Sequence, residues 1–92
     1  MRVVWSKTAI SHLIGIHRYI AEDKPGAAKR MARRISACAR QLGRYPHLGR
    51  PGREADTREL IVGGTPYILV YEVRRKRLVI LAVLHAAQER TD

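Results

Sequence analysis

The sequence predicts an α+β domain in which a strand and a helical hairpin precede a three-stranded antiparallel sheet. Apolar residues recur every three or four positions in the first half of the chain, which is helical spacing. In the second half, segments rich in β-branched and aromatic residues are joined by short connections, as in antiparallel sheets. The 92 residues are enough for one domain, so we treat residues 1–92 as a single unit.

The first half of the chain predicts one short strand and two helices. Val3–Trp5 is a run of strand-favouring residues, and Ser6 suits the N-cap of the helix that follows. Helical spacing then extends from about Thr8 to Glu22. Pro25 suits the first turn of a second helix, which ends near Gly43 and bears small apolar residues on one side and basic residues on the other. The short connection predicts that the two helices form an antiparallel hairpin.

The second half predicts an ordered loop and three strands. Tyr45–Asp56 is rich in proline and glycine, which is typical of a loop rather than a strand. Strand patterns follow over Thr57–Val62, Pro66–Val73 and Leu78–His85, with connections short enough for antiparallel pairing. We expect the polar residues after Ala87 to fray.

The last two predicted strands are apolar on both faces. Tyr67, Leu69 and Tyr71 alternate with Ile68 and Val70, so neither face of the strand has the polar pattern of a solvent-exposed face. A helical hairpin covers only one face of a sheet. We therefore expect loop residues and the C-terminal tail to cover the other face, or that face to be an interaction site.

The chain is strongly basic. It has 18 Lys and Arg residues against 8 Asp and Glu, a formal charge of +10, and most of the basic residues are arginine. This excess predicts an acidic partner: nucleic acid, a nucleic-acid machine or an acidic protein. A membrane surface fits less well, because no predicted helix combines a bulky apolar face with this charge. With no signal-peptide pattern and no apolar run of membrane-spanning length, we expect a cytoplasmic protein.

The sequence contains no motif for binding a metal ion or a cofactor. The single cysteine, Cys38, excludes an internal disulfide, and its position among helical alanines favours a small buried thiol. The four histidines, His12, His17, His47 and His85, lack metal-ligand spacing. His12 and His17 diverge by about 140° on one helix, so we interpret both as structural or surface residues. We expect no metal and no cofactor.

Several segments follow one another in an order found in one family of small proteins. Tyr45–Arg53 leads into Thr57–Val62, then into Gly64–Tyr71 and Ile80–His85, and the N-terminal stretch from Trp5 to Ala28 fits the same pattern. This succession resembles the RelE/ParE toxin superfamily, and its ParE-like branch in particular, over residues 2 to 90. The resemblance implies the toxin of a type II toxin–antitoxin pair, with a strand, a helical hairpin and a three-stranded antiparallel sheet.

The resemblance also implies a protein partner. Toxins of this superfamily are silenced by a cognate antitoxin, ParD-like or similar, whose C-terminal region wraps the toxin in a hetero-oligomer. We expect an antitoxin helix to dock in the groove between the helical hairpin and the sheet, and an antitoxin strand to add to a sheet edge. The expected antitoxin-binding residues are apolar: Leu13, Ile20, Ile35, Ile68, Val70 and Leu84.

Two activities are known in the superfamily. ParE-like toxins poison DNA gyrase, whereas RelE-like toxins cut mRNA in the ribosomal A site, which needs proton-transfer groups and cations. RelE-like toxins resemble one another in an arginine directly after the aromatic residue of the second hairpin strand. Here Ile68 follows Tyr67, and of two earlier sheet positions that hold lysine in those toxins, Arg58 keeps a charge and Leu60 does not. The resemblance therefore favours a non-hydrolytic gyrase poison. The alternatives are a ribosome-dependent mRNA endoribonuclease and a nucleic-acid-binding module without toxicity.

Two residues keep the ribonuclease alternative open. His85 ends the last strand and is either an acid–base group or a hydrogen-bonded structural residue. Arg58 either contacts phosphate or target, or forms a salt bridge with Asp56 or Glu72.

The basic face of the second helix either meets nucleic acid or an acidic antitoxin, or is a solvated face. The expected target or nucleic-acid contacts are Arg50, Arg53, Arg58, Arg74, Arg75, Lys76 and Arg77.

Overall fold

The computed structural model describes the backbone of residues 1–89 and the side chains of residues 1–87. The elements in chain order are β1 (Arg2–Trp5), α1 (Lys7–Ala21), α2 (Pro25–Arg44), β2 (Arg50–Pro51), β3 (Thr57–Ile61), β4 (Tyr67–Val73), β5 (Arg77–His85) and α3 (Ala86–Glu89). The α+β class is confirmed, and each predicted helix and strand ends within about one residue of its expected bounds. Two short elements differ from expectation, because β2 lies in the predicted loop and α3 lies where fraying was expected.

The sheet has five strands in the order β1-β5-β4-β3-β2, rather than the three that were predicted. The strand at the N-terminus joins it in parallel beside β5, with Trp5 opposite Ile80. All other pairs are antiparallel, and β2 adds the pair Arg50 and Glu59 at the opposite edge. Proline is tolerated in β2 because that strand lies at an edge, where one side of its backbone has no strand to pair with.

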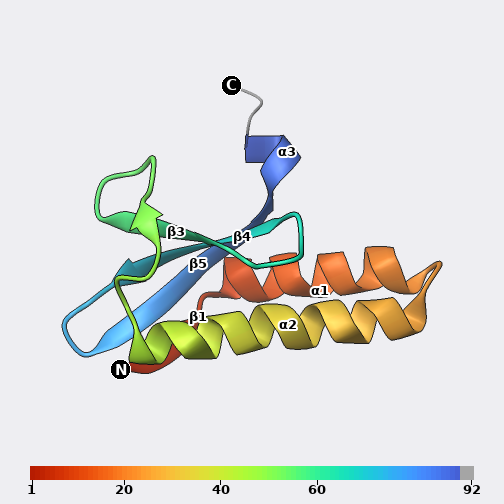
Figure 1. Cartoon of the computed structure of the whole chain (residues 1–92), viewed down its shortest axis with the longest axis horizontal. Helices are drawn as coiled ribbons and strands as arrows, with labels where there is room; N and C mark the ends of the chain where they lie inside the picture. Colours follow the sequence, from red (N-terminus) through yellow and green to blue (C-terminus); the bar gives the residue numbers. More distant parts are fainter. Residues whose placement is uncertain (90–92) are drawn as a thin grey trace.

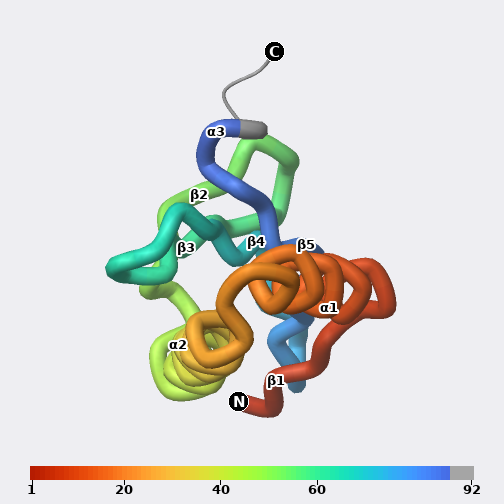
Figure 2. The backbone as a smooth tube through the Cα atoms, turned by 90° about the vertical axis from the view of Figure 1, so that its right-hand side faces the viewer, coloured from red at the N-terminus to blue at the C-terminus, as the bar shows by residue number. Residues whose placement is uncertain are grey.

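The helices form one layer, and the sheet forms a second layer above it (Figures 1 and 2). Helices α1 and α2 run antiparallel under one face of the sheet, whereas α3 and the β2–β3 connection rise on the opposite side (Figure 1). The N-terminus lies beside α2 (Figure 2), where the Met1 amino group donates to the Gly43 carbonyl oxygen at 2.8 Å. The face away from the helices is only partly covered: Ile68 is buried there, whereas Ile61 is 58% exposed.

Ser6 joins β1, α1 and β5. Its hydroxyl oxygen accepts from the Ala9 N–H at 3.0 Å, which is the predicted N-cap, and the hydroxyl donates to the Leu81 carbonyl oxygen at 3.2 Å. The Ser6 N–H also donates to the Ile80 carbonyl oxygen. The start of α1 is therefore fixed against β5. Pro25 begins α2 as predicted, because a helix needs no N–H from its first residues.

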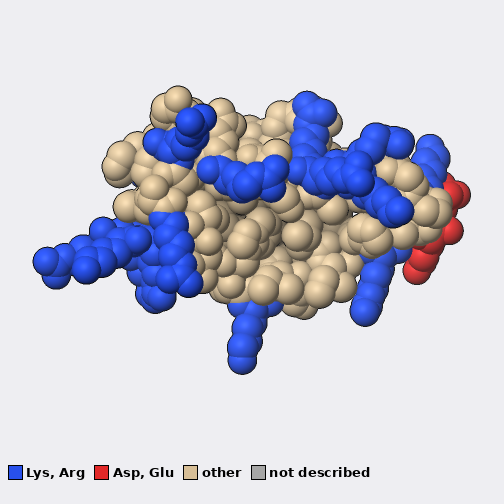
Figure 3. Space-filling model, turned by 90° about the horizontal axis from the view of Figure 1, so that it is seen from below, with Lys and Arg blue, Asp and Glu red and all other residues tan. Residues whose placement is uncertain are grey.

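The outer surface of the helical layer is basic. Figure 3 shows Lys and Arg side chains spread along this surface, with Asp and Glu side chains only at one end. Helix α2 contains five arginines and one lysine and no acidic residue. The basic residues and the buried residues of α2 therefore occupy different sides of the same helix.

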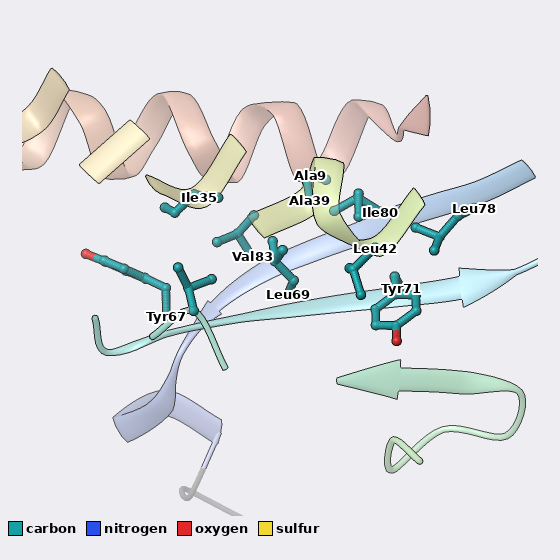
Figure 4. Close-up of a cluster of buried hydrophobic side chains, with 11 residues drawn as sticks. Ala9, Ile35, Ala39, Leu42, Tyr67, Leu69, Tyr71, Leu78, Ile80 and Val83 are labelled. Carbon is teal, nitrogen blue, oxygen red and sulfur yellow. The ribbon is translucent and has the colours of Figure 1, made fainter. Parts of the chain in front are cut away.

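The core lies between the helices and the sheet (Figure 4). Small residues, Ala9 from α1 and Ala39 from α2, allow the helices to approach closely, and larger apolar side chains of β4 and β5 fill the space between the helices and the sheet. Cys38 is half-buried and packs against this cluster, where burial raises the pKa of its thiol. Tyr71 is fully buried, and its hydroxyl points out of the cluster (Figure 4).

Candidate functional site

A buried tyrosine of β4 anchors the loop between α2 and β2. The Tyr71 hydroxyl accepts from the Gly49 N–H at 2.9 Å and donates to the Pro46 carbonyl oxygen at 2.7 Å. Burial raises the pKa of Tyr71, an effect that the Gly49 hydrogen bond and the nearby Arg58 charge partly oppose. The hydroxyl therefore keeps its proton and its bond to Pro46 at neutral pH. A Cβ on Gly49 would lie 2.7 Å from the Tyr71 hydroxyl oxygen, so this close approach requires glycine.

Arg58 takes part in the same anchor. Its Nη1 donates to the Gly49 carbonyl oxygen at 2.7 Å, and its side chain is half-buried. The proposed salt bridge with Asp56 or Glu72 is absent from the described residues, since Glu72 pairs with Arg74 at 2.8 Å. The salt-bridge interpretation of Arg58 was therefore wrong, because its Nη1 is bonded to a backbone carbonyl oxygen instead.

A buried carboxylate of β3 organises the neighbouring basic loop. Glu59 is 7% exposed, and its two oxygens accept from the Arg50 guanidinium at 3.2 Å and the Arg53 N–H at 3.3 Å. These groups line a hollow of about 420 Å³ on the sheet face away from the helices, together with Ile68 and Ala86. Two predicted target contacts, Arg50 and Arg53, thus lie together at one hollow.

A second hollow, of about 610 Å³, separates α1 from the ends of β4 and β5. We call it the histidine groove; its lining residues are Ser11, His12, Gly15, Ile16, Tyr19, Tyr67 and His85. The first five belong to α1 and the last two to the strands. The groove thus lies between the helical hairpin and the sheet, where an antitoxin helix was expected.

Both histidines of the groove accept hydrogen bonds from the backbone. His12 Nδ1 accepts from the Val83 N–H at 3.2 Å, a group on the edge of β5 that β1 no longer covers. His85 Nδ1 accepts from the Ala87 N–H at 3.1 Å, and its ring meets Tyr67 edge-on with centroids 5.5 Å apart. These bonds assign the proton of each neutral imidazole to Nε2. In its neutral form each ring therefore keeps an Nε2–H that is not used in these two bonds.

The two residues behind the ribonuclease alternative are not brought together. His85 lines the histidine groove, whereas the Arg58 guanidinium is bonded to the loop at Gly49 and is not part of the groove lining. Ile68 occupies the position at which RelE-like toxins have an arginine in common, and its side chain is only 3% exposed.

The six predicted antitoxin-binding residues do not share one surface. Ile35 is fully buried in the core and Ile68 is nearly so, which means that neither offers surface to a partner in the folded chain. Leu13 and Ile20 are half-buried on α1. Val70 and Leu84 are half-buried on the sheet face away from the helices, since they alternate with residues that face the core.

The other predicted target contacts lie at the β4–β5 turn. Arg74, Arg75, Lys76 and Arg77 are exposed there, and none of them lines the hollow that contains Arg50 and Arg53. The basic residues predicted to contact the target therefore occupy three places: a hairpin tip, a hollow of the sheet face and, for Arg58, the loop anchor at Gly49.

Three roles were not foreseen from the sequence. The bond from the Val83 N–H to His12 fits its interpretation as a structural or surface residue, but its place beside His85 in the groove was not foreseen. Glu59 and Tyr71 were read only as strand residues, yet they position the loop. The one available signal was a glutamate in a strand with arginines nearby in sequence, since a buried carboxylate needs such partners.

Metal and membrane features are absent from the part of the chain that the structure describes. Among these residues, no group of three or more His, Cys, Asp or Glu could hold a metal ion. Within the same range, no helix has the length and apolar content that crossing a bilayer requires.

Comparisons with known proteins agree with this architecture. A family model described as "ParE toxin of type II toxin-antitoxin system, parDE" matches residues 3–90. The chain is 42% identical over 88 residues to "Putative toxin Y4kP" of Sinorhizobium fredii, covering 96% of this chain and 91% of the relative. It is 39% identical over 87 residues to "Toxin RelE2" of Caulobacter vibrioides, covering 95% and 97%. A chain of the chromosomal ParDE TA system from P. aeruginosa, 22% identical, has the same fold with a TM-score of 0.85, covering 92% of this chain and 95% of that one.

Proposed function

Because the chain belongs to the ParE toxin family of type II toxin–antitoxin systems, we propose that it inhibits growth by poisoning DNA gyrase until a cognate antitoxin neutralises it. Poisoning here means that the toxin binds gyrase and its DNA and does not itself hydrolyse a phosphodiester bond. This activity needs surface complementarity and charge rather than a catalytic centre.

One observation supports a non-hydrolytic mechanism. Of the three sheet positions considered for catalytic cations, Ile68 and Leu60 are apolar, and the half-buried Arg58 donates from its Nη1 to the Gly49 carbonyl oxygen. Cleavage of RNA builds negative charge on the phosphorus centre, and nearby cations stabilise that charge. Arg58 is thus the one cation left at these positions, and neither it nor any other Lys or Arg is among the residues that line the groove of His85.

A supercoiling assay tests the proposal directly. Purified full-length chain, mixed with gyrase, ATP and relaxed plasmid, is expected to stop supercoiling and to leave linear DNA after protein removal. The variant with Arg75→Gln, Lys76→Gln and Arg77→Gln is expected to inhibit less, because exposed basic residues accelerate encounter with DNA-bound gyrase. The variant with Lys7→Gln, Arg18→Gln and Lys24→Gln removes the same charge from α1 and the helical turn and is expected to inhibit as the wild type does. Supercoiling that continues at saturating wild-type toxin contradicts the gyrase proposal.

The ribonuclease alternative has one structural observation in its favour. His85 and His12 both line a hollow that also contains Tyr67, and one relative is named a RelE toxin. Primer extension on mRNA after induction separates the two activities. New cleavage sites that disappear with His85→Ala would favour the ribonuclease. Intact mRNA in growth-arrested cells would favour gyrase.

For the antitoxin, we propose the histidine groove as the docking site of one helix. Its lining includes the exposed Tyr19 and the half-buried Ile16, so a helix with apolar side chains finds apolar surface there. A strand can add to β3 beyond the two residues that β2 covers. Gly15→Trp should fill the groove and weaken antitoxin binding at least tenfold, while Gly63→Trp, at an open exposed glycine in the β3–β4 turn, should not. Equal affinities for both variants contradict this docking site.

A further inference from the structure

Five exposed basic side chains form a continuous strip along α2. We call it the basic ridge; its residues are Lys29, Arg30, Arg33, Arg40 and Arg44. At 100° per residue they fall within an arc of about 100° and extend over about 22 Å of helix. Arg34 lies at the edge of this arc and leans over the β3–β4 turn, where its Nη2 is 2.9 Å from the position of a Cβ on Gly64. The ridge is thus a straight row of cations on one side of a helix.

The ridge lacks acidic neighbours along the chain. From Lys24 to Arg53 the sequence contains no Asp or Glu. Within the described residues, the ion pairs that the structure shows involve Arg50 with Glu59 and Arg74 with Glu72, and none involves α2. Figure 3 shows the acidic side chains of this face gathered at one end, away from most of the basic ones. The positive charge of the ridge is therefore available to an external anion.

The orientation of the ridge is fixed by the core. Ala28, Ile35, Ala39 and Leu42 are buried on the opposite side of α2. Rotation of the helix would expose these residues, so the basic side chains have a constant direction relative to the sheet. A row of charges with fixed spacing suits a partner whose charges are also regularly spaced.

The residues between the cations indicate which kind of partner fits. Within the arc, the uncharged positions are Gly26 and Ala37, and no bulky apolar side chain lies among them. Protein interfaces need an apolar centre, and membrane surfaces need a bulky apolar face, whereas a phosphate backbone needs only cations. We propose that the basic ridge of α2 binds the phosphate backbone of duplex DNA without sequence specificity.

The charge density of the two partners agrees. Duplex DNA has one negative charge per ~1.7 Å of axis, so a 22 Å helix passes about 13 phosphate charges, more than enough for five cations. If all five make contact, the logarithm of affinity falls with the logarithm of salt with a slope of about −4.5. Affinity would then drop about 500-fold between 50 and 200 mM salt. This binding does not depend on gyrase being the toxin target.

The test measures fluorescence anisotropy of a labelled duplex of random sequence with the purified full-length chain at several salt concentrations. The ridge variant Arg30→Gln, Arg33→Gln, Arg40→Gln leaves two contacts, so the slope should fall to about −1.8 and the salt effect to about 12-fold. Glutamine keeps helix propensity close to that of arginine, and circular dichroism confirms the fold. The charge-matched control is Lys7→Gln, Arg18→Gln, Lys24→Gln, which should keep a slope near that of the wild type.

Three outcomes overturn the proposal. An equal loss of slope in both variants shows that net charge alone binds DNA. Unchanged DNA binding in the ridge variant, with weaker binding to the cognate antitoxin, assigns α2 to an acidic protein. A wild-type chain that does not bind duplex DNA at low salt removes the premise, and the supercoiling assay then still reports separately on gyrase.

Discussion

Removal of the Tyr71 hydroxyl should lower the free energy of unfolding markedly, because this one group makes two hydrogen bonds to the loop backbone. In Tyr71→Phe, the Gly49 N–H loses its acceptor and the Pro46 carbonyl oxygen loses its donor. Both backbone groups belong to the loop between α2 and β2. Gly49 is buried, so water does not readily replace the lost acceptor. An ordinary hydrogen bond contributes about 1 kcal/mol, and an unsatisfied buried group costs about 1–3 kcal/mol. We expect the free energy of unfolding to fall by about 2–3 kcal/mol.

Urea denaturation followed by circular dichroism measures this loss. Small domains have about 5–15 kcal/mol of stability, so the change is a large share of the total and corresponds to a Tm lower by about 10–20 °C. The control is Tyr19→Phe, because Tyr19 is 77% exposed. Its stability should change by less than about 0.5 kcal/mol.

The result that would refute this reasoning is equal stability of the two variants. It would mean that the loop from Pro46 to Gly49 does not depend on Tyr71, or that water enters and satisfies both backbone groups. A lower denaturant midpoint for Tyr71→Phe with an unchanged m-value is the expected pattern, since the loop remains part of the same cooperative unit.

Four other predictions concern stability. Gly49→Ala should destabilise by more than about 1 kcal/mol, because its Cβ would meet the Glu59 carbonyl oxygen and the Tyr71 hydroxyl oxygen, both at 2.7 Å. Gly15→Ala, in the middle of α1 with open space around it, should instead stabilise by about 0.5–1 kcal/mol; the opposite order of the two melting temperatures would contradict the geometry. Ser6→Ala should cost about 1 kcal/mol through loss of the α1 cap, and a neutral effect in thermal melts would mean that the cap is dispensable. Burial raises the pKa of Tyr71 above 10.0, the ordinary value for tyrosine, so the folded chain holds this proton more tightly than the unfolded chain. Stability should therefore be complete below pH 10 and decline as the pH rises through the folded-state pKa, and Tyr71→Phe should show a shallower decline; identical alkaline slopes would count against it.

The sequence predicted those parts of the candidate site that depend on neighbouring residues, and not those that depend on packing between distant segments. Arg74 to Arg77 were left between two predicted strands, and the structure has Arg74 to Lys76 in that turn and Arg77 as the first residue of β5, all exposed. The groove between hairpin and sheet was expected, but its lining histidines were not, because His12 and His85 are far apart in sequence. No spacing rule relates two residues that meet through the packing of a helix on a strand.

The sequence by itself determined the class and the local elements. Apolar spacing gave α1 and α2 their bounds, Ser6 and Pro25 marked the helix starts, and short connections required β3, β4 and β5 to pair antiparallel. Each of these signals acts over a few residues, where backbone geometry links side-chain pattern to structure.

Only the tertiary structure decided how distant segments combine. The parallel pairing of β1 with β5, the anchor from Tyr71 to Gly49 and the burial of Glu59 beside Arg50 all join residues separated by a loop or by most of the chain. Such contacts form because the folded core brings the groups together and excludes water from them, and neither condition is written in a local pattern.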